Sequence, residues 1–447
     1  MCYPNPSRKK EPMATISQLH SEMSEILGPS ANEVSRATGF TQRQSKLTGS
    51  VFAQAMVFST LLDEDLTYTL LAKEAAIRGA EISPQGIEQR FTEASANLMH
   101  ELLKDAVQKA LGGVHRIEGM SRFSGIYLRD SSVIRLPVEL YKVWPGVGGS
   151  AGETSAVKLQ VRLEYITGQV AGPELHCGRT HDTSSPFHSE ELPAGALRIG
   201  DLGYFDMDQF QKDNQQGVFW ISRYKVKTLV YDENGQLIDL LTWLRSLSQP
   251  QVETSILLGH MRLPCRLLIQ RVPQEVADQR RHKIKDYARK KQVAPSELLM
   301  ALADWTLVIT NIPADQIVFR EILVLLKVRW QVELLFKKWK SLFKIDEWRS
   351  GNPWRILTEL YAKLLAVVIF HWFTLLDGFQ SPQRSVWKAA LIFKRFALSL
   401  SLAFDAVHAF SVVVSAFIRT IDKSARLNPR SAHPNTIQEL THCPSLA

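Results

Sequence analysis

The stretch that decides the fold is ALRIGDLGYFDMDQFQKDNQQGVFWISRYK, residues 196–225. It begins as a short apolar strand that stops at Asp201 before a glycine turn, and it continues as a polar helical segment. A second apolar strand follows at 217–225. Because strand, helix and strand follow one another, we predict a mixed α/β fold for the middle of the chain.

The preceding segments also have the period of two that is typical of strands. Residues 125–137, GIYLRDSSVIRLP, predict a strand with Ile126, Leu128 and Asp130 on one face. Residues 157–168, VKLQVRLEYITG, alternate apolar and polar side chains. We therefore expect a second strand that is exposed on its polar side.

The first hundred residues have helical spacing instead. From about 14 to 111 apolar residues recur at helical intervals, which predicts an all-helical domain. Within it, NEVSRATGFTQRQSKL resembles a short helix, a glycine turn and a second helix carrying Arg43 and Lys46. This arrangement places a helix in a DNA groove in many proteins, but a purely structural helix pair explains it equally well.

Residues 225–313 are expected to form strands and loops, ending with WTLVITNIP. They contain a basic run at 280–291, RRHKIKDYARKK, in which Asp286 is the only acid. Such a run is often a solvated face, yet the excess of positive charge, which includes Arg280 and Arg281, favours contact with DNA.

The composition indicates a globular protein with a polyanionic partner. The chain has 447 residues, a net charge of +8 and a sequence pI near 9.2, and lysines and arginines that neutralise phosphates release counterions from nucleic acid. Membrane binding is the rival explanation of the charge. Two apolar runs bear on this explanation. The run at 364–376 contains His371, and the run at 396–418 contains Asp405 and His408. Both are therefore predicted to be buried helices rather than membrane spans.

The cysteines and a nearby histidine cluster do not indicate a zinc finger. The four cysteines form no CxxC pair, which is typical of the reducing cytoplasm. His176, Cys177, His181 and His188 lie close together, but their spacing matches no standard zinc pattern. A polar surface loop is the simpler interpretation.

The segment LKVRWQVELLFKKWKSLF predicts a helix that carries a stripe of charge. Residues at i, i+4 and i+7 share one face of a helix, so Arg329, Glu333 and Lys340 project together, with Lys337 beside them. This stripe could be an exposed salt-bridge network. We expect apolar residues to pack the other side and hold the stripe in place: Trp330, Leu334, Leu335, Trp339 and Leu342.

Asp130 and Asp201 each lie near the end of an apolar strand, where a carboxylate is costly without a compensating cation. Together with Glu333 they form a set of hard oxygen ligands that suits Mg²⁺. Two such ions, about 3.5–4 Å apart, support in-line displacement at phosphorus. The three carboxylates therefore predict nuclease or strand-transfer chemistry.

The same residues carry a resemblance to a known family. RWQVELLFKKWKS resembles the signature helix of insertion-sequence transposases with a ribonuclease H-like core, specifically the insertion-sequence-four family with its tyrosine, arginine, glutamate and lysine motif. YLRDSSVIRLP, GDLGYF and VITNIP extend the similarity, which runs from about 35 to 375. One position departs from the motif, because Leu326 stands where the family has its tyrosine.

The resemblance implies roles for individual residues. It implies that Asp130, Asp201 and Glu333 bind two Mg²⁺ ions, for which Mn²⁺ can substitute, and that Arg329 and Lys340 contact DNA phosphate. The long interval between Asp201 and Glu333 then holds a β-rich insertion. In relatives the insertion helps to handle a hairpin intermediate at the transposon end. Trp220 or Trp243 either stacks on a displaced base or packs in the core, and the core is the expected place. Further DNA contacts are expected at these positions: Lys337, Arg223, Arg43, Lys46, Arg280 and Arg281.

The expected organisation is a ribonuclease H-like core interrupted by an insertion and flanked by helical regions. The expected parts are a disordered tail at 1–13, a helical DNA-binding domain at 14–115, the first part of the core at 116–224, the β-rich insertion at 225–313, the second part of the core at 314–375, and a helical carboxy-terminal region with a polar tail at 376–447.

The expected activity is cut-and-paste transposition. Metal-dependent hydrolysis at the ends of an insertion sequence is followed by attack of the freed 3'-hydroxyl on target DNA, without a covalent protein intermediate. The expected partners are double-stranded DNA with terminal inverted repeats and a second copy of the chain, which meets the first through helices after Pro353. We expect a cytoplasmic, nucleoid-associated bacterial protein with no membrane partner. A catalytically inactive repressor derived from a transposase and a structure-selective nuclease are the alternatives.

Overall fold

The computed structural model describes residues 15–63, 65–109, 122–148, 152–376, 384–428 and 439. The expected disordered tail at 1–13 and most of the polar carboxy-terminal tail lie outside these residues. The chain divides into two compact units. The first comprises Met1–Ile117, Ser131–Thr180 and Val332–Ser431, and the second comprises Glu118–Asp130, His181–Gln331 and Ala432–Ala447.

The amino-terminal part of the first unit is helical, as predicted. Threonine and serine side chains cap several of its helices, as Thr15 does for the first and Thr48 for the third, because their oxygens accept from otherwise unpaired backbone N–H groups. The elements are α1 (Ile16–Glu25), the π-helix η1 (Ile26–Ser30), α2 (Ala31–Ala37), α3 (Gly49–Leu62), α4 (Tyr68–Ile77), α5 (Pro84–Glu88) and α6 (Glu93–Gln108).

The prediction that residues after Gly39 form the second helix of a helix–turn–helix is wrong. Helix α2 ends at Ala37, Gly39 adopts a φ of 76° that ends the helical path, and residues 40–48 form turns until Thr48 caps α3. Arg43 and Lys46 therefore lie in a loop. Turn-forming polar residues at 41–46 outweigh the weak helical spacing that suggested a second helix.

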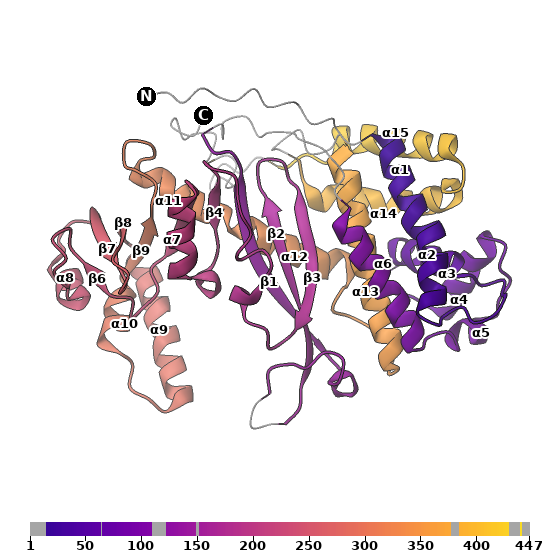
Figure 1. Cartoon of the computed structure of the whole chain (residues 1–447), viewed down its shortest axis with the longest axis horizontal. Coiled ribbons are helices and arrows are strands. Elements are labelled where there is room, and N and C mark those ends of the chain that lie inside the picture. The colour runs from indigo at the N-terminus through magenta and orange to yellow at the C-terminus, as the bar shows by residue number, and fades with distance from the viewer. Residues whose placement is uncertain are drawn as a thin grey trace. The chain divides into compact units, whose positions relative to one another are not determined.

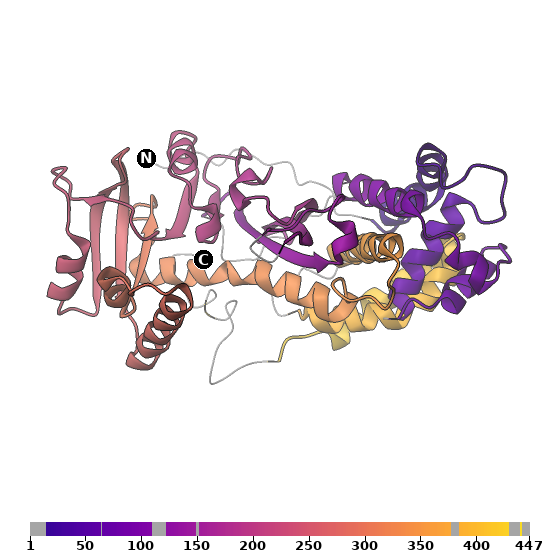
Figure 2. The same cartoon turned by 90° about the horizontal axis from the view of Figure 1, so that it is seen from below.

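The carboxy-terminal helices share a core with the amino-terminal ones. Helix α13 (Pro353–Leu376) packs against α3 and α6, and Ser95 Oγ lies 2.9 Å from Thr358 Oγ1 across the α6 contact. Helices α14 (Val386–Ala403) and α15 (Val407–Ser424) pack on each other, and α14 also packs on α3. The indigo to purple helices and the orange to yellow helices lie side by side in both views (Figures 1 and 2).

Helix α13 is long and apolar enough to span a membrane, but 94% of its most apolar window is buried inside the protein. It includes the run 364–376, whose prediction as a buried helix is confirmed. The second apolar run, 396–418, is not one helix, because the chain leaves the helix between Ala403 and Val407.

The first unit also holds a hairpin of β2 (Ser155–Glu164) and β3 (Val170–Cys177), with a register shift between Gln160 and Arg162. The prediction that β2 is exposed on its polar side is wrong. Lys158 and Glu164 are buried, and Gln160 is 0% exposed. Alternation of polar and apolar residues identified the strand, but burial of both faces depends on packing that no local pattern reports.

The strands of the second unit form a mixed sheet around a parallel centre. The amino-terminal half of β1 (Ile126–Leu136) pairs in parallel with β4 (Leu197–Ile199), which pairs in parallel with β5 (Phe219–Arg223). Beyond β5 the order is β9 (Trp305–Thr310), β8 (Leu263–Arg271), β7 (Gln251–Leu258) and β6 (Val230–Tyr231), all antiparallel.

Strand β1 belongs to both units, and within the first unit its carboxy-terminal half is followed in the sheet order by β2 and β3. This order is that of a ribonuclease H-like core, and the four strands after β5 are added to it. The predicted mixed α/β class, with a ribonuclease H-like core and flanking helical regions, is confirmed.

Helices accompany the sheet of the second unit. Helix α7 (Met207–Gln215) connects β4 and β5, as the opening stretch of sequence predicted. Residues 225–313 were expected to hold strands and loops only, and this is wrong. They also form α8 (Leu240–Ser246), α9 (Gln274–Lys291) and α10 (Glu297–Leu302).

Trp220 and Trp243 are part of the hydrophobic core of the second unit. Trp220 is fully buried, stacks on Phe210 at 4.3 Å and donates from Nε1 to Asn214. Trp243 packs against the same cluster. The expected core position is confirmed for both residues.

Candidate active site

The register of the parallel strands brings the two predicted aspartates together. Leu128 of β1 is paired with Ile199 of β4, the last residue of that strand. Asp130 follows Leu128 by two residues and Asp201 follows Ile199 by two residues, so both aspartates lie at the same end of the two strands. Neighbouring strands are separated by about 4.8 Å. Both side chains are partly exposed, so they face solvent at the edge where β4 ends.

Asp201 is held by the turn that follows β4. It is the N-cap of η4 (Leu202–Tyr204), and its Oδ1 accepts from the N–H of Gly203 at 2.8 Å. A Cβ at position 203 would lie 3.0 Å from the same Oδ1 and 2.6 Å from Oδ2 of Asp182. A methyl group at position 203 would therefore have to displace the carboxylate of Asp182, which is a third carboxylate beside the pair.

The sequence analysis missed Asp182. It begins η3 (Asp182–Ser184), which packs against η4. The histidines around it were interpreted as part of a polar surface loop, and no local pattern marks the carboxylate of Asp182 itself. Its position beside Asp201 comes from the packing of two short turns that are distant in sequence.

Tyr204 lies beneath the carboxylates. Its ring lies 5.0 Å from the guanidinium carbon of Arg129 and stacks on His188. Burial raises the pKa of the Tyr204 hydroxyl well above its usual value, and the negative charges of Asp182, Asp130 and Asp201 raise it further. The phenol is therefore a neutral hydrogen-bond donor near three carboxylates.

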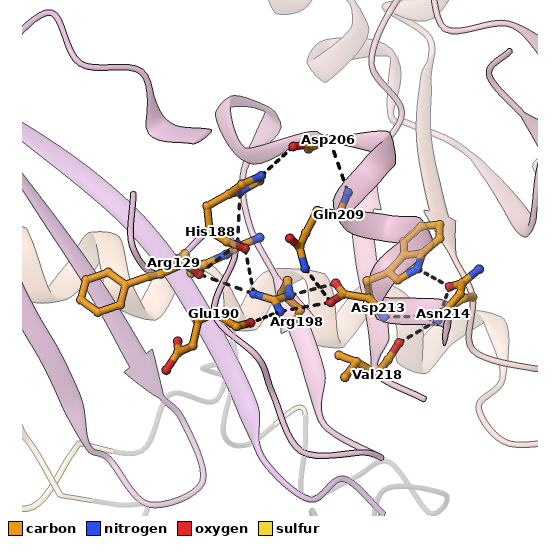
Figure 3. A network of polar contacts seen from close by, with 12 residues as sticks. Arg129, His188, Glu190, Arg198, Asp206, Gln209, Asp213, Asn214 and Val218 are labelled. Atoms are coloured by element: carbon orange, nitrogen blue, oxygen red, sulfur yellow. Dashed lines mark hydrogen bonds and ion pairs between the residues drawn. The ribbon is translucent and has the colours of Figure 1, made fainter. Parts of the chain in front are cut away.

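Two buried arginines support this edge from the strands themselves (Figure 3). Arg129 precedes Asp130 in β1 and donates to the carbonyl oxygen of His188 at 2.8 Å. Arg198 in β4 donates to the carbonyl oxygen of Glu190 at 2.8 Å. Burial, with the nearby charge of Arg198, lowers the pKa of Arg129 to about 9, so it stays charged at neutral pH.

Asp213 on α7 compensates the charge of Arg198. Its Oδ2 accepts from Nε of Arg198 at 2.8 Å, and its Oδ1 accepts from Nη2 at 3.1 Å and from Gln209 at 2.9 Å. The side chains of Arg198 and Asp213 are 1% and 0% exposed. This pair joins α7 to β4, the strand that precedes Asp201.

His188 completes the network between the arginines and α7. Its Nε2 lies 2.9 Å from Oδ2 of Asp206, and its Nδ1 lies 3.3 Å from a donor nitrogen of Arg129. Because Arg129 has only donors, Nδ1 must accept, so neutral His188 carries its proton on Nε2. Burial lowers the pKa of His188. The expectation of a polar surface loop is wrong for His188, which is buried.

The predicted glutamate lies on α12 (Trp330–Phe343), in the first unit. Glu333 is partly exposed in its first turn, Lys337 is exposed, and Lys340 is 4.0 Å from Asp346. The predicted single helix from 317 to 343 is recorded as α11 (Phe319–Val328) and α12, with Arg329 between them.

The apolar side of α12 differs in part from the prediction. Trp330 is 46% exposed, and Leu334 and Leu335 are only partly buried. Trp339 and Leu342 are buried as expected. The other buried residues of the helix are Val332, Phe336 and Phe343.

The predicted DNA contacts on the basic run are of two kinds. Arg280 donates to the carbonyl oxygen of Trp305 at 2.8 Å, and Arg281 pairs with Asp278 and Asp304. Both arginines therefore tie α9 to its surroundings. The remaining cations of the run are exposed on α9: Lys283, Lys285, Arg289, Lys290 and Lys291. Arg223 is exposed at the end of β5.

The donor set at the Asp130 edge is compatible with a hydrated divalent cation. Mg²⁺ commonly takes one or two protein carboxylates and keeps several waters. Asp130 in β1 and Asp201 just after β4 would supply two such ligands. Among the described residues, no three His, Cys, Asp or Glu side chains form a ready-made metal cage.

Comparison with known proteins identifies the class. A family model described as transposase DDE domain matches residues 122–369, more than half of the chain. The transposase for insertion sequence element IS231F of Bacillus thuringiensis subsp. israelensis is 28% identical over 360 residues, which are 75% of each chain. The transposase for IS1151 of Clostridium perfringens is 25% identical over 364 residues, 76% of each chain. The matched region contains the Asp130 and Asp201 edge and helix α12. The chain therefore belongs to the transposase DDE domain family.

Proposed function

We propose that the protein catalyses cut-and-paste transposition by metal-dependent cleavage at the ends of an insertion sequence and strand transfer to target DNA. The observation that supports the proposal is that Asp130 and Asp201 each follow by two residues the paired Leu128 and Ile199 of adjacent parallel strands, inside the region matched by the family model. Glu333 is the third proposed catalytic residue and lies in the same matched region.

Asp130, Asp201 and Glu333 would together hold two Mg²⁺ ions, for which Mn²⁺ can substitute. When bound, such ions make water or a 3'-hydroxyl more nucleophilic and stabilise the leaving oxygen. The chain contributes fixed carboxylates whose positions depend on β1, η4 and α12. Arg329 and Lys340 would bind DNA phosphate beside them.

The organisation that we propose follows the resemblance to the insertion-sequence-four family. Residues 14–115 would bind DNA, 116–224 and 314–375 would form the catalytic core, and 225–313 would be the insertion. Arg43, Lys46, Arg223 and Lys337 would contact DNA. A protein that acts on chromosomal DNA in bacteria would work in the cytoplasm, at the nucleoid.

The carboxy-terminal region at 376–447 would hold two copies of the chain together. Helix α13 is buried within its unit, so the surface proposed for the contact lies on α14. Trp387, Leu391, Leu398 and Leu402 are exposed and recur at helical spacing on one face of α14. A homodimer that buries this face would bridge two DNA ends.

Cleavage of DNA that carries the element's inverted repeats, in the presence of Mg²⁺, tests the proposal. Asp130→Ala, Asp201→Ala and Glu333→Ala should each abolish cleavage and retain binding of the ends. Asp208→Ala is the matched control, because Asp208 is an exposed acid in the same unit. Equal cleavage of DNA without the repeats would instead indicate a structure-selective nuclease.

A repressor that binds ends without cleaving them is the second candidate. The observation that favours it is Leu326, which stands at the motif's tyrosine position and is buried in α11. Tight binding of the repeats by the wild-type chain without cleavage in Mg²⁺ or Mn²⁺ would support this candidate and overturn the first.

A further inference from the structure

A hollow in the first unit is lined by the loop that the sequence predicted to be a helix. The loop contributes residues 38–45 and 47, and the segment that leads into α6 contributes residues 89, 90, 92–94 and 97. The hollow has a volume of about 760 Å³, which falls within the roughly 300–1,000 Å³ of pockets that hold ligands. All of its lining belongs to the first unit. The hollow is therefore large enough to receive part of a partner molecule.

Two buried apolar side chains anchor the ends of this loop. Phe40 is 7% exposed and Leu47 is 3% exposed. The N–H of Thr41 donates to the carbonyl oxygen of Ser35 at 3.0 Å, and the N–H of Leu47 donates to Oγ of Ser45 at 3.3 Å. The loop therefore has a fixed path although it is not helical, which lowers the ordering cost when a partner binds.

The polar side chains that line the hollow are open to solvent. Arg90 is partly exposed, and these five residues are exposed: Gln42, Arg43, Gln44, Gln89 and Asn97. The remaining polar groups of the lining are the hydroxyls at positions 38, 41, 45 and 92 and the carboxylate of Glu93. Apart from Glu93, all of these side chains can donate hydrogen bonds.

This lining suits a ligand that accepts hydrogen bonds and carries negative charge. Phosphate oxygens accept and do not donate, and arginine, amide and hydroxyl side chains are groups that contact DNA phosphate and sugar. Arg43 and Arg90 outnumber Glu93 in the lining, and Lys46 is exposed in the same loop. The hollow therefore has the charge to attract a polyanion.

The concave shape favours the DNA backbone over the base edges. Base edges lie at the floor of a groove, about 8.5 Å deep for the major groove, and are reached by a protruding helix or ribbon. The sugar–phosphate backbone forms the ridge between the grooves, and a hollow can hold such a ridge. Because the loop lines a hollow and does not form a helix, contact with the backbone is the mode that fits its shape.

We infer that this hollow binds the sugar–phosphate backbone of duplex DNA, with Arg43 and Arg90 on phosphate oxygens and the neighbouring amides as further donors. Contacts of this kind fix the position of the DNA and carry no direct sequence information. The inference rests on the proposed function, in which residues 14–115 bind DNA, and it names the part of the DNA that this region holds.

Binding of two duplexes of equal length to the full chain tests the inference, with fluorescence anisotropy as the readout between about 50 and 200 mM salt. One duplex carries the terminal inverted repeat and the other has an unrelated sequence. Each phosphate contact contributes about 0.9 to the slope of log affinity against log salt, so Arg43→Gln with Arg90→Gln should lower the slope by about 1.8 on both duplexes. An unchanged slope overturns the inference. A loss of affinity confined to the repeat duplex also overturns it, because the hollow would then read bases.

Gln44→Glu is a second variant, which decides the matter if the double arginine variant fails to fold. It keeps the size of the side chain, replaces a donor amide with a carboxylate, and should weaken binding of both duplexes several-fold because the carboxylate repels phosphate. Gln108→Glu is the matched control, since Gln108 is exposed at the opposite end of α6 from the hollow, and its affinity should stay close to that of the wild type. Equal weakening by both glutamate variants overturns the assignment to the hollow.

Cleavage of the repeat duplex by the wild-type chain separates this inference from the proposed function. If the wild-type chain binds and cleaves the repeats while the arginine variant keeps the same slope, only the role of the hollow is rejected. If the wild-type chain binds neither duplex, the proposed function is rejected as well.

Discussion

The Arg198 and Asp213 pair offers a quantitative test of how this site is supported. Asp213 accepts three hydrogen bonds, and both side chains of the pair are excluded from solvent. Asp213→Asn keeps the shape of the side chain but leaves the buried guanidinium without a counter-charge. Removing one partner of a buried ion pair costs about 3–5 kcal/mol.

We expect a loss near the lower end, about 3 kcal/mol, because backbone carbonyls at 188 and 190 still accept from Arg198. The chain has two units, so a global unfolding midpoint would average over both. Hydrogen exchange of a peptide covering α7 and β5 reports the second unit directly. A loss of 3 kcal/mol corresponds to about 100-fold faster exchange of its slowest amides.

The control is the exposed pair of Arg245 and Glu297, whose side chains are 60% and 75% exposed. Glu297→Gln should change stability by less than about 1 kcal/mol. If Asp213→Asn changes exchange no more than Glu297→Gln does, Arg198 is satisfied by the carbonyls alone and the reasoning is refuted. The double variant Arg198→Met with Asp213→Leu should recover much of the loss.

Three further predictions concern separate parts of the molecule. Gly203→Ala should slow DNA cleavage by at least about 10-fold with little change in thermal stability, since the added methyl group would lie 3.0 Å from Oδ1 of Asp201, a proposed catalytic residue, and shift its carboxylate; an unchanged rate would contradict this. The second change replaces three exposed lysines of α9 with glutamine: Lys283, Lys285 and Lys290. It should lower the salt dependence of DNA binding and reduce the slope of log affinity against log salt by roughly 3. An unchanged slope would show that α9 does not contact the DNA. Burial lowers the pKa of His371 to about 4, and its Nε2 accepts from the backbone of Val170. As the pH falls, His371 is therefore protonated at a higher pH in the unfolded chain than in the folded chain. Urea denaturation should show that the free energy of unfolding decreases by about 3 kcal/mol as pH falls from 6.5 to 4. His371→Gln should flatten that profile, and an equally steep profile would assign it to other groups.

The sequence predicted the elements whose evidence is local. Alternation identified β1, β2, β4 and β5, helical spacing identified the amino-terminal and carboxy-terminal helices, and glycine turns marked strand ends. The carboxylates Asp130 and Asp201 were found because an acid in an apolar strand is costly wherever that strand lies. The basic run was also visible, but its helical form was not, because α9 has few apolar residues to show a period.

Predictions from local sequence patterns were wrong where tertiary packing determines the burial or the conformation of a segment. Both faces of β2 are buried, the turn at residues 40–48 replaces an expected helix, and Trp330 is exposed although it belongs to an apolar series. Arg280 and Arg281 read as surface charge in the sequence, yet they bind neighbouring groups of their own unit.

The sequence by itself determined the fold class and the transposase class, and it singled out the two aspartates, because periodicity and unusual residue types are properties of neighbouring positions. Only the tertiary structure decided that the strands before Asp130 and Asp201 are neighbours, that Asp182 lies beside Asp201, and that two buried arginines bind the backbone of residues 188 and 190. The physical reason is that strand register and the contacts of buried charges join segments far apart in the chain. The energies of these contacts depend on distances in space, and the number of residues between two segments does not determine those distances.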